Sequence, residues 1–265
     1  MFKRMIKTFI QDIKDKRLTT VAGAWVYYFL SSALPLAFLL VTAFGVFGVN
    51  VSVQIVDRLP EEFRTAGHAI ISAAENASNG VTIFFIITVV ISCSTLLNQM
   101  SKDGDYIYGV NSKYKRGIMR RVSAVFAIIA LFFLFLGAAF LFAFGSMVFA
   151  GVHADNGTQL FLTILTFLLV ICFGYAIILL LNVFISPVRL SFKGLALGSF
   201  ISLSVIVVGT IGFTVYLRFF SNYNAFYGSL AAIVIFLLWA YICMLGLACG
   251  AIINMRVNSK LIKSN

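Results

Sequence analysis

The chain has 265 residues, of which 61% are hydrophobic and only 11% are charged. An ordinary soluble domain carries roughly a quarter charged residues, so this chain lacks the polar side chains that a water-exposed surface needs. A net charge of +11 would suggest nucleic acid as a partner for a soluble protein, but here the charges lie between long apolar runs. We therefore predict an all-α, polytopic membrane protein that binds no nucleic acid.

The first 18 residues combine charge with apolar residues at helical spacing. The apolar positions are Phe2, Met5, Ile6, Phe9, Ile10 and Ile13, with lysines among the polar positions. This pattern is typical of a basic amphipathic helix lying on the inner leaflet, and we predict one within residues 1–18. The apolar run that follows is too long for the core of a signal peptide, so we expect the first span to remain as an anchor.

Six stretches without Asp, Glu, Lys or Arg are each longer than the roughly 20 residues that cross about 30 Å of hydrocarbon. We predict transmembrane helices near 21–48, 81–99, 122–150, 159–185, 195–218 and 229–254, the first one kinked at Pro35. In the loop after the first span, Leu59-Pro60-Glu61-Glu62 is typical of a helix start and predicts a short helix. The chain is thus expected to form a single membrane domain over 1–265, a six-helix bundle.

Lys and Arg gather on one side of these spans. Of the 20 basic residues, all except Arg58, Arg64 and Arg218 lie in the N-terminal segment, the second and fourth loops or the C-terminal tail. The positive-inside rule therefore places both termini in the cytoplasm.

Small residues indicate how the last two spans pack. Gly194-x-x-x-Gly198 and Gly246-x-x-x-Gly250 each form a small-residue helix face, which favours packing within the chain and leaves dimerisation as the alternative. The four cysteines lie inside apolar runs, as small hydrophobic residues do.

Catalytic and metal-binding patterns are missing from the sequence. The two histidines are isolated, and Glu61-Glu62 is better explained as the first turn of a helix than as a catalytic pair. No metalloprotease, serine-hydrolase or phosphate-loop motif occurs. We expect no enzymatic activity, no metal and no cofactor.

Three polar clusters are candidates for specific contacts. The first span contains Tyr27, Tyr28, Ser31, Ser32 and Pro35, the cytoplasmic end of the second contains Asn98, Asp105 and Tyr108, and the last outer loop contains Asn224, Tyr227, Gly228 and Ser229. Pro35 cannot donate to the Ser31 carbonyl, which predicts a polar notch in mid-membrane. A packed kink, ion pairs with nearby cations and an interfacial aromatic belt are the structural alternatives for the three clusters.

These clusters carry a family resemblance over nearly the whole chain. Ala24-Trp25-Val26-Tyr27-Tyr28 with Ser31, Ser32 and Pro35, Asp105-Tyr106-Ile107-Tyr108-Gly109, and Tyr223-Asn224-Ala225-Phe226-Tyr227-Gly228-Ser229-Leu230-Ala231-Ala232 are similar to motifs of the YihY/BrkB family of bacterial inner-membrane proteins. Members of that family were formerly mislabelled ribonuclease BN. The family has an acidic residue after its last Gly-Ala, where this chain has Ile252, so any role of that carboxylate is in doubt here.

The polar notch in an otherwise neutral bundle, together with the cationic inner face, suggests a transporter or flippase for a lipid or a lipid-linked anionic molecule. The twelve candidate residues would then line a path through the bacterial cytoplasmic membrane, with basic residues holding an anionic head group at the cytoplasmic face. A non-transporting envelope scaffold is the alternative, and a small-solute transporter or channel is a third. Membrane lipids are the expected partners, and a homo-oligomer or an envelope protein partner stays open.

Overall fold

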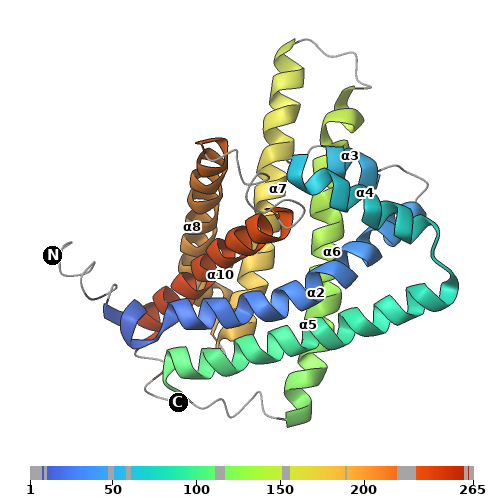
Figure 1. Cartoon of the computed structure of the whole chain (residues 1–265). Coiled ribbons are helices and arrows are strands. Elements are labelled where there is room, and N and C mark those ends of the chain that lie inside the picture. Colours follow the sequence, from blue (N-terminus) through green and yellow to red (C-terminus); the bar gives the residue numbers. More distant parts are fainter. Residues whose placement is uncertain are drawn as a thin grey trace. The chain divides into compact units, whose positions relative to one another are not determined.

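The computed structural model describes residues 8, 11–46, 51–57, 61–110, 117–150, 156–188, 190–219, 231–259 and 262. Within these residues the chain is helical and contains no strand. Six helices are long and apolar enough to cross a membrane (Figure 1). They are α2 (Leu18–Val46), α5 (Asn79–Tyr108), α6 (Gly117–Ala150), α7 (Asn156–Ile185), α8 (Phe192–Phe219) and α10 (Ala231–Val257). The prediction of an all-α protein with six membrane spans is confirmed.

The N-terminal segment meets the first span at a tight turn. Residues 11–15 are helical, and Arg17 adopts a left-handed conformation with φ of 45° before α2 begins at Leu18. Half of the amphipathic helix predicted over 1–18, residues 1–7, 9 and 10, lies outside the described residues. α2 continues through Pro35 as a single helix, as predicted.

The second span is longer than its charge pattern predicts. We expected it to end near residue 99, but α5 continues to Tyr108 through Lys102, Asp103 and Asp105. The prediction was wrong because charged residues were taken as the end of the helix, although a carboxylate can remain in a helix when neighbours donate to it. α5 ends where Gly109, with φ of 68°, closes a Schellman motif, in which the Val110 amide donates to the Asp105 carbonyl at 3.1 Å.

Two helices, rather than one, occupy the loop between the first two spans. The predicted short helix is α4 (Glu61–Glu75), and it is preceded by α3 (Val51–Asp57), which the sequence did not reveal. A Cβ built on Gly67 would lie 2.7 Å from a methyl carbon of Val56, so the glycine allows α3 and α4 to approach closely. His68 pairs with Asp57 across the same contact, with an N–O distance of 3.4 Å.

The helices pack as two compact units. The first contains the described residues of 1–30, 93–125 and 178–265, and the second those of 31–92 and 126–177. α2, α5, α6 and α7 each pass from one unit into the other. The single membrane domain expected from the sequence stays a prediction.

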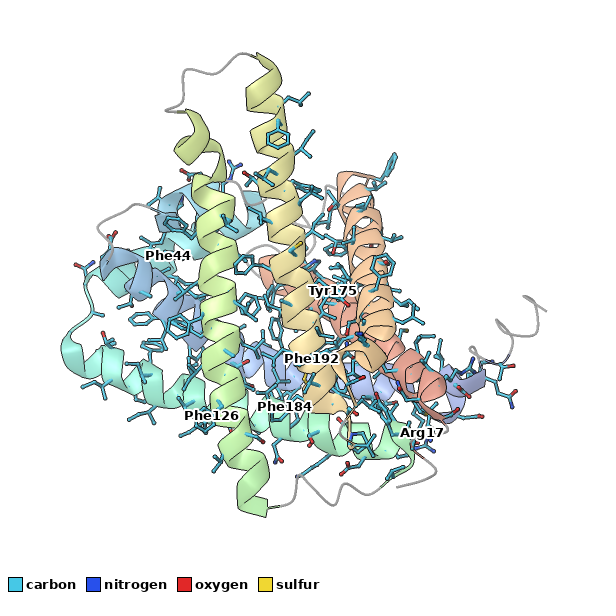
Figure 2. All side chains as sticks on the ribbon, turned by 180° about the vertical axis from the view of Figure 1, so that it is seen from behind. Arg17, Phe44, Phe126, Tyr175, Phe184 and Phe192 are labelled. Carbon is cyan, nitrogen blue, oxygen red and sulfur yellow. The ribbon has the colours of Figure 1, made fainter. Side chains whose placement is uncertain are left out.

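Aromatic contacts hold the second unit together. Phe38 on α2 stacks on Phe85 of α5 with ring centroids 3.9 Å apart. Phe44, labelled in Figure 2, is buried against Ile55, Leu136 and Ala139.

Many large apolar side chains are exposed rather than buried. Phe126 on α6 and Phe192 on α8, both labelled in Figure 2, are 69% and 70% exposed. Exposed phenylalanines would be unfavourable in water but suit contact with lipid chains. The contacts between buried polar side chains lie mainly in the first unit.

Candidate functional site

α8 and α10 approach each other through the glycines that the sequence singled out. A Cβ on Gly198 would overlap the backbone carbonyl of Gly250, and a Cβ on Gly250 would overlap the Ser202 hydroxyl. Only glycine permits this backbone separation. The predicted packing of the two small-residue faces within the chain is thus confirmed.

Three asparagines form a buried polar network beside these glycines. Asn182 on α7 and Asn254 on α10 are both 0% exposed. The side-chain amide of Asn254 donates to the side-chain oxygen of Asn182 at 3.2 Å, and the side-chain amide of Asn182 donates to the Ser199 hydroxyl at 3.1 Å. The Gly198 backbone amide donates to Asn254 at 3.0 Å, and Asn258 donates to the Gly194 carbonyl at 2.9 Å. The network therefore joins α7, α8 and α10 without any charged group.

Sequence reasoning missed this network. Asn182, Ser199 and Asn254 each sit inside an apolar run, where a single polar residue does not interrupt the hydropathy that identifies a span. Asn258 follows Arg256 just beyond α10, four residues after Asn254, and this helical spacing was the available signal. Asn182 and Ser199 gave no such signal, because only the packing of α7 on α8 brings them together. Ile252 is fully buried.

A second polar contact joins α2 to α5 within the first unit. The indole nitrogen of the fully buried Trp25 donates to Asp103 at 2.7 Å, and Gln99 donates to the other carboxylate oxygen at 3.0 Å. Both donors favour the ionised carboxylate and explain how Asp103 remains within a helix. At the next residue, Gly104 allows α5 to contact the backbone carbonyl of Ile185 at the end of α7.

The N-terminal segment crosses the same end of the unit. Arg256, in the last turn of α10, donates to Asp12 through Nε at 2.7 Å, and its Nη2 lies 2.7 Å from the same carboxylate oxygen as an ion pair. The Lys16 ammonium group donates to the Tyr106 carbonyl at 3.4 Å and lies 5.7 Å from the centre of the Tyr106 ring. Residues 12–16 thereby connect the C-terminal ends of α5 and α10.

The five candidates on α2 divide between two sides of the helix. Tyr27 is 67% exposed and Ser31 is also exposed, whereas Ser32 and Pro35 are buried and Tyr28 is half-buried. Thr20 shares the exposed side, and a Cβ on Gly23 would meet nothing within 4 Å. α2 therefore presents hydroxyl groups to its surroundings along the side that carries Thr20 and Tyr27.

The candidates on α5 lie near its C-terminal end. Asn98 and Asp105 are half-buried and Tyr108 is buried. An open depression of about 390 Å³ is lined by Lys102, Asp105, Tyr106, Gly109 and Val110. Because the helix C-terminus and Asp105 are negative and Lys102 is positive, this depression has no single charge preference.

The remaining candidates cannot be placed. Asn224, Tyr227, Gly228 and Ser229 lie outside the described residues. Among the residues that are described, no three His, Cys, Asp or Glu side chains are grouped closely enough to hold a metal ion.

Comparison with known proteins agrees with this architecture. The model of a family described as virulence factor BrkB matches residues 9–263. A UPF0761 membrane protein of Paraburkholderia xenovorans is 24% identical over 95% of this chain, which spans 59% of that relative's length. A UPF0761 membrane protein of Photobacterium profundum is also 24% identical, over 94% of this chain and 79% of its own.

A third relative bears an older label. The protein YfkH of Bacillus subtilis, named as ribonuclease-like, is 28% identical over 70% of this chain and 68% of its own. No solved structure matches the chain. Since the family model covers nearly every residue of a chain with six membrane-spanning helices, the chain belongs to the virulence factor BrkB family of membrane proteins.

Proposed function

We propose that the protein moves a lipid, or a lipid-linked molecule, with an anionic head group across the membrane. The observation that carries the proposal is the exposed polar side of α2, where Thr20, Gly23 and Tyr27 recur at helical spacing. Because α2 is long and apolar enough to cross a membrane, hydroxyl groups on its exposed side are accessible to lipids. A polar head group could contact them while its acyl chains remain in the bilayer.

Basic residues near the start of this helix favour an anionic head group. Arg17 and Lys102 are exposed, and Lys16 is half-buried beside Tyr106. Cations at a membrane surface attract anionic lipids by about 1 kcal/mol each. The uneven distribution of Lys and Arg supports a cytoplasmic location for this end and for both termini, in a bacterial cytoplasmic membrane.

The proposal includes no catalytic step, cofactor or nucleic acid. The name of the Bacillus relative refers to a ribonuclease, but hydrolysis of a phosphodiester requires an activated water held by a metal or a base. The described residues contain no metal-binding group, and the polar network of α7, α8 and α10 is neutral and hydrogen-bonded within itself.

Reconstituted vesicles test the proposal directly. Protein in liposomes would be assayed for movement of fluorescent phosphatidylglycerol between leaflets, with phosphatidylcholine as the neutral comparison lipid. Tyr27→Phe removes one exposed hydroxyl and should slow phosphatidylglycerol movement about threefold or more, because a hydrogen bond in a membrane contributes about 0.6–1.7 kcal/mol. Tyr216→Phe, at an exposed tyrosine of α8, is the matched control.

Two further variants extend the test along α2. Ala substitutions at Tyr28 and Ser31 should also slow movement, whereas Tyr216→Phe should not. Equal rates for the wild type, these variants and protein-free liposomes would reject the transport proposal. A constant partner in mild-detergent purification would then favour the envelope scaffold.

A further inference from the structure

The contacts between α8 and α10 follow one antiparallel register in steps of four residues. Asn258 lies against Gly194, Asn254 against Gly198 and Gly250 against Ser202. Towards the other end, Gly246 lies against Ile206 and Ile242 against Gly209. Every level includes at least one glycine.

The first two levels of this series contain the same pair of residue types. Both place an asparagine, Asn254 within α10 or Asn258 directly after it, against a glycine of α8, one helical turn apart. If α10 moved by one turn towards the Phe219 end of α8, Asn258 would take the place of Asn254 beside Gly198. It would then also stand where Asn254 now donates to Asn182, so that Asn182 would keep an amide partner.

The other levels remain compatible after this movement. Gly250 would face Ile206, as Gly246 does now, and Gly246 would take the place of Ile242 against Gly209. Movement in the opposite direction would place Gly250 against Gly198 and Ile242 near Ile206, so Gly198 would lose its asparagine partner and two large side chains would meet. Only movement towards the Phe219 end keeps an asparagine beside Gly198 and avoids a contact between two isoleucines.

Ser202 supplies an independent observation. Its side chain is 0% exposed, and its hydroxyl has no hydrogen-bond partner among the described residues. A buried hydroxyl without a partner is costly in a membrane. After the one-turn movement, Asn254 would lie at the level of Ser202 and could bond with this hydroxyl.

We propose that α8 and α10 form a two-register interface, in which α10 slides by one helical turn and Asn254 exchanges Gly198 for Ser202. The slide amounts to about 6 Å, four residues at 1.5 Å each. One-turn shifts of packed helices are an established type of two-state transition. The Asp12–Arg256 ion pair attaches α10 to the N-terminal segment and favours the first register.

The register change is independent of the lipid proposal, although it would provide the two conformations that a transporter needs. The test measures distances between spin labels in lipid nanodiscs, where transport plays no part. The background is the full chain with its cysteines replaced by alanine, at Cys93, Cys172, Cys243 and Cys249. Activity in liposomes is a separate measurement, so either idea can fail alone.

Two label pairs report the movement with opposite signs. Phe200 with Ile233 and Val215 with Val257 combine exposed positions on α8 and α10, each pair about 30 Å apart along the helix axes. A slide of α10 towards the Phe219 end lengthens the first distance and shortens the second, each by about 6 Å. A tilt or a general loosening would not produce opposite changes of this size.

Two variants should shift the populations in opposite directions. Ser202→Ala removes the acceptor of the second register and should lower its share relative to the first by roughly fivefold, the effect of one hydrogen bond. Gly194→Ala places a Cβ 2.9 Å from the Asn258 oxygen, which disfavours the first register and should raise the second. Ser204→Ala, at a serine that bonds within its own helix, should change neither population.

The outcome decides the matter in either direction. The two-register interface is supported if each label pair shows two distance populations, if the second population is longer in one pair and shorter in the other, and if Ser202→Ala and Gly194→Ala change the population shares as described. A single distance for both label pairs in the wild type and in Gly194→Ala, or changes of the same sign, would overturn it.

Discussion

Gly198→Ala should destabilise the protein strongly, although alanine is the better helix former. In an exposed helix the change would gain up to about 1 kcal/mol. At position 198 the new Cβ overlaps Asn254 and the Gly250 carbonyl, so α8 and α10 must separate. Separation weakens two asparagine bonds, at about 0.6–1.7 kcal/mol each, and overpacking costs about 1–3 kcal/mol. We expect a net loss of about 2–4 kcal/mol.

Thermal unfolding in detergent measures this loss. For a chain of this size, 1 kcal/mol corresponds to about 2–4 °C, so the Tm should fall by roughly 4–16 °C. Both tryptophans, Trp25 and Trp239, lie in the first unit and report its unfolding by fluorescence. Gly212→Ala is the control on the same helix, because a Cβ there would meet nothing within 4 Å. A Tm of Gly198→Ala equal to that of Gly212→Ala would refute the close approach of α8 and α10.

Three further predictions concern other parts of the chain. Trp25→Phe removes one donor to Asp103 and should lower the Tm. The double variant with Asp103→Asn should have nearly the same Tm as Trp25→Phe alone, because both residues serve one contact. Additive losses of Tm would contradict this coupling. Charge reversal of Asp12 alone should destabilise by about 1 kcal/mol, and simultaneous reversal of Arg256 should restore the Tm at low salt; no restoration would argue against the ion pair. Cys172, exposed on the apolar part of α7, should resist thiol reagents that cannot enter a bilayer, and rapid labelling in intact cells would show that this stretch is in water.

Charge gaps were sufficient to locate the six spans, because each crossing needs about 20 apolar residues and nothing else in the chain supplies them. The same criterion failed at the end of α5. In the sequence, Asp103 lies just past the end of an uncharged stretch and so suggests the end of a span. In the folded chain, the indole nitrogen of Trp25, far away in the sequence, donates to its carboxylate. α3 was missed for a similar reason, since Val56 needs Gly67 of the following helix as its packing partner.

The candidate site was only partly accessible to sequence reasoning. Tyr27 and Ser31 could be selected because hydroxyl groups are rare in an apolar run, but their helix position did not reveal which side faces outwards. The sequence could not identify Asn182 as part of a polar network, because its partners depend on the register of α7, α8 and α10. The glycine pairs indicated that helices meet closely, and the asparagines determine at which level they meet.

The polar groups of this protein therefore fall into two classes with different consequences. Asn254 is buried and hydrogen-bonded to two other helices, so its replacement by leucine should lower stability first and activity only as a result. Tyr27 is exposed on α2, and its replacement by phenylalanine leaves packing and hydrophobic contact almost unchanged. A transport defect in Tyr27→Phe at unchanged Tm would identify the exposed side of α2 as functional. If only variants with a lowered Tm transport poorly, the exposed hydroxyls have no special role, and the interior network alone accounts for the polar residues.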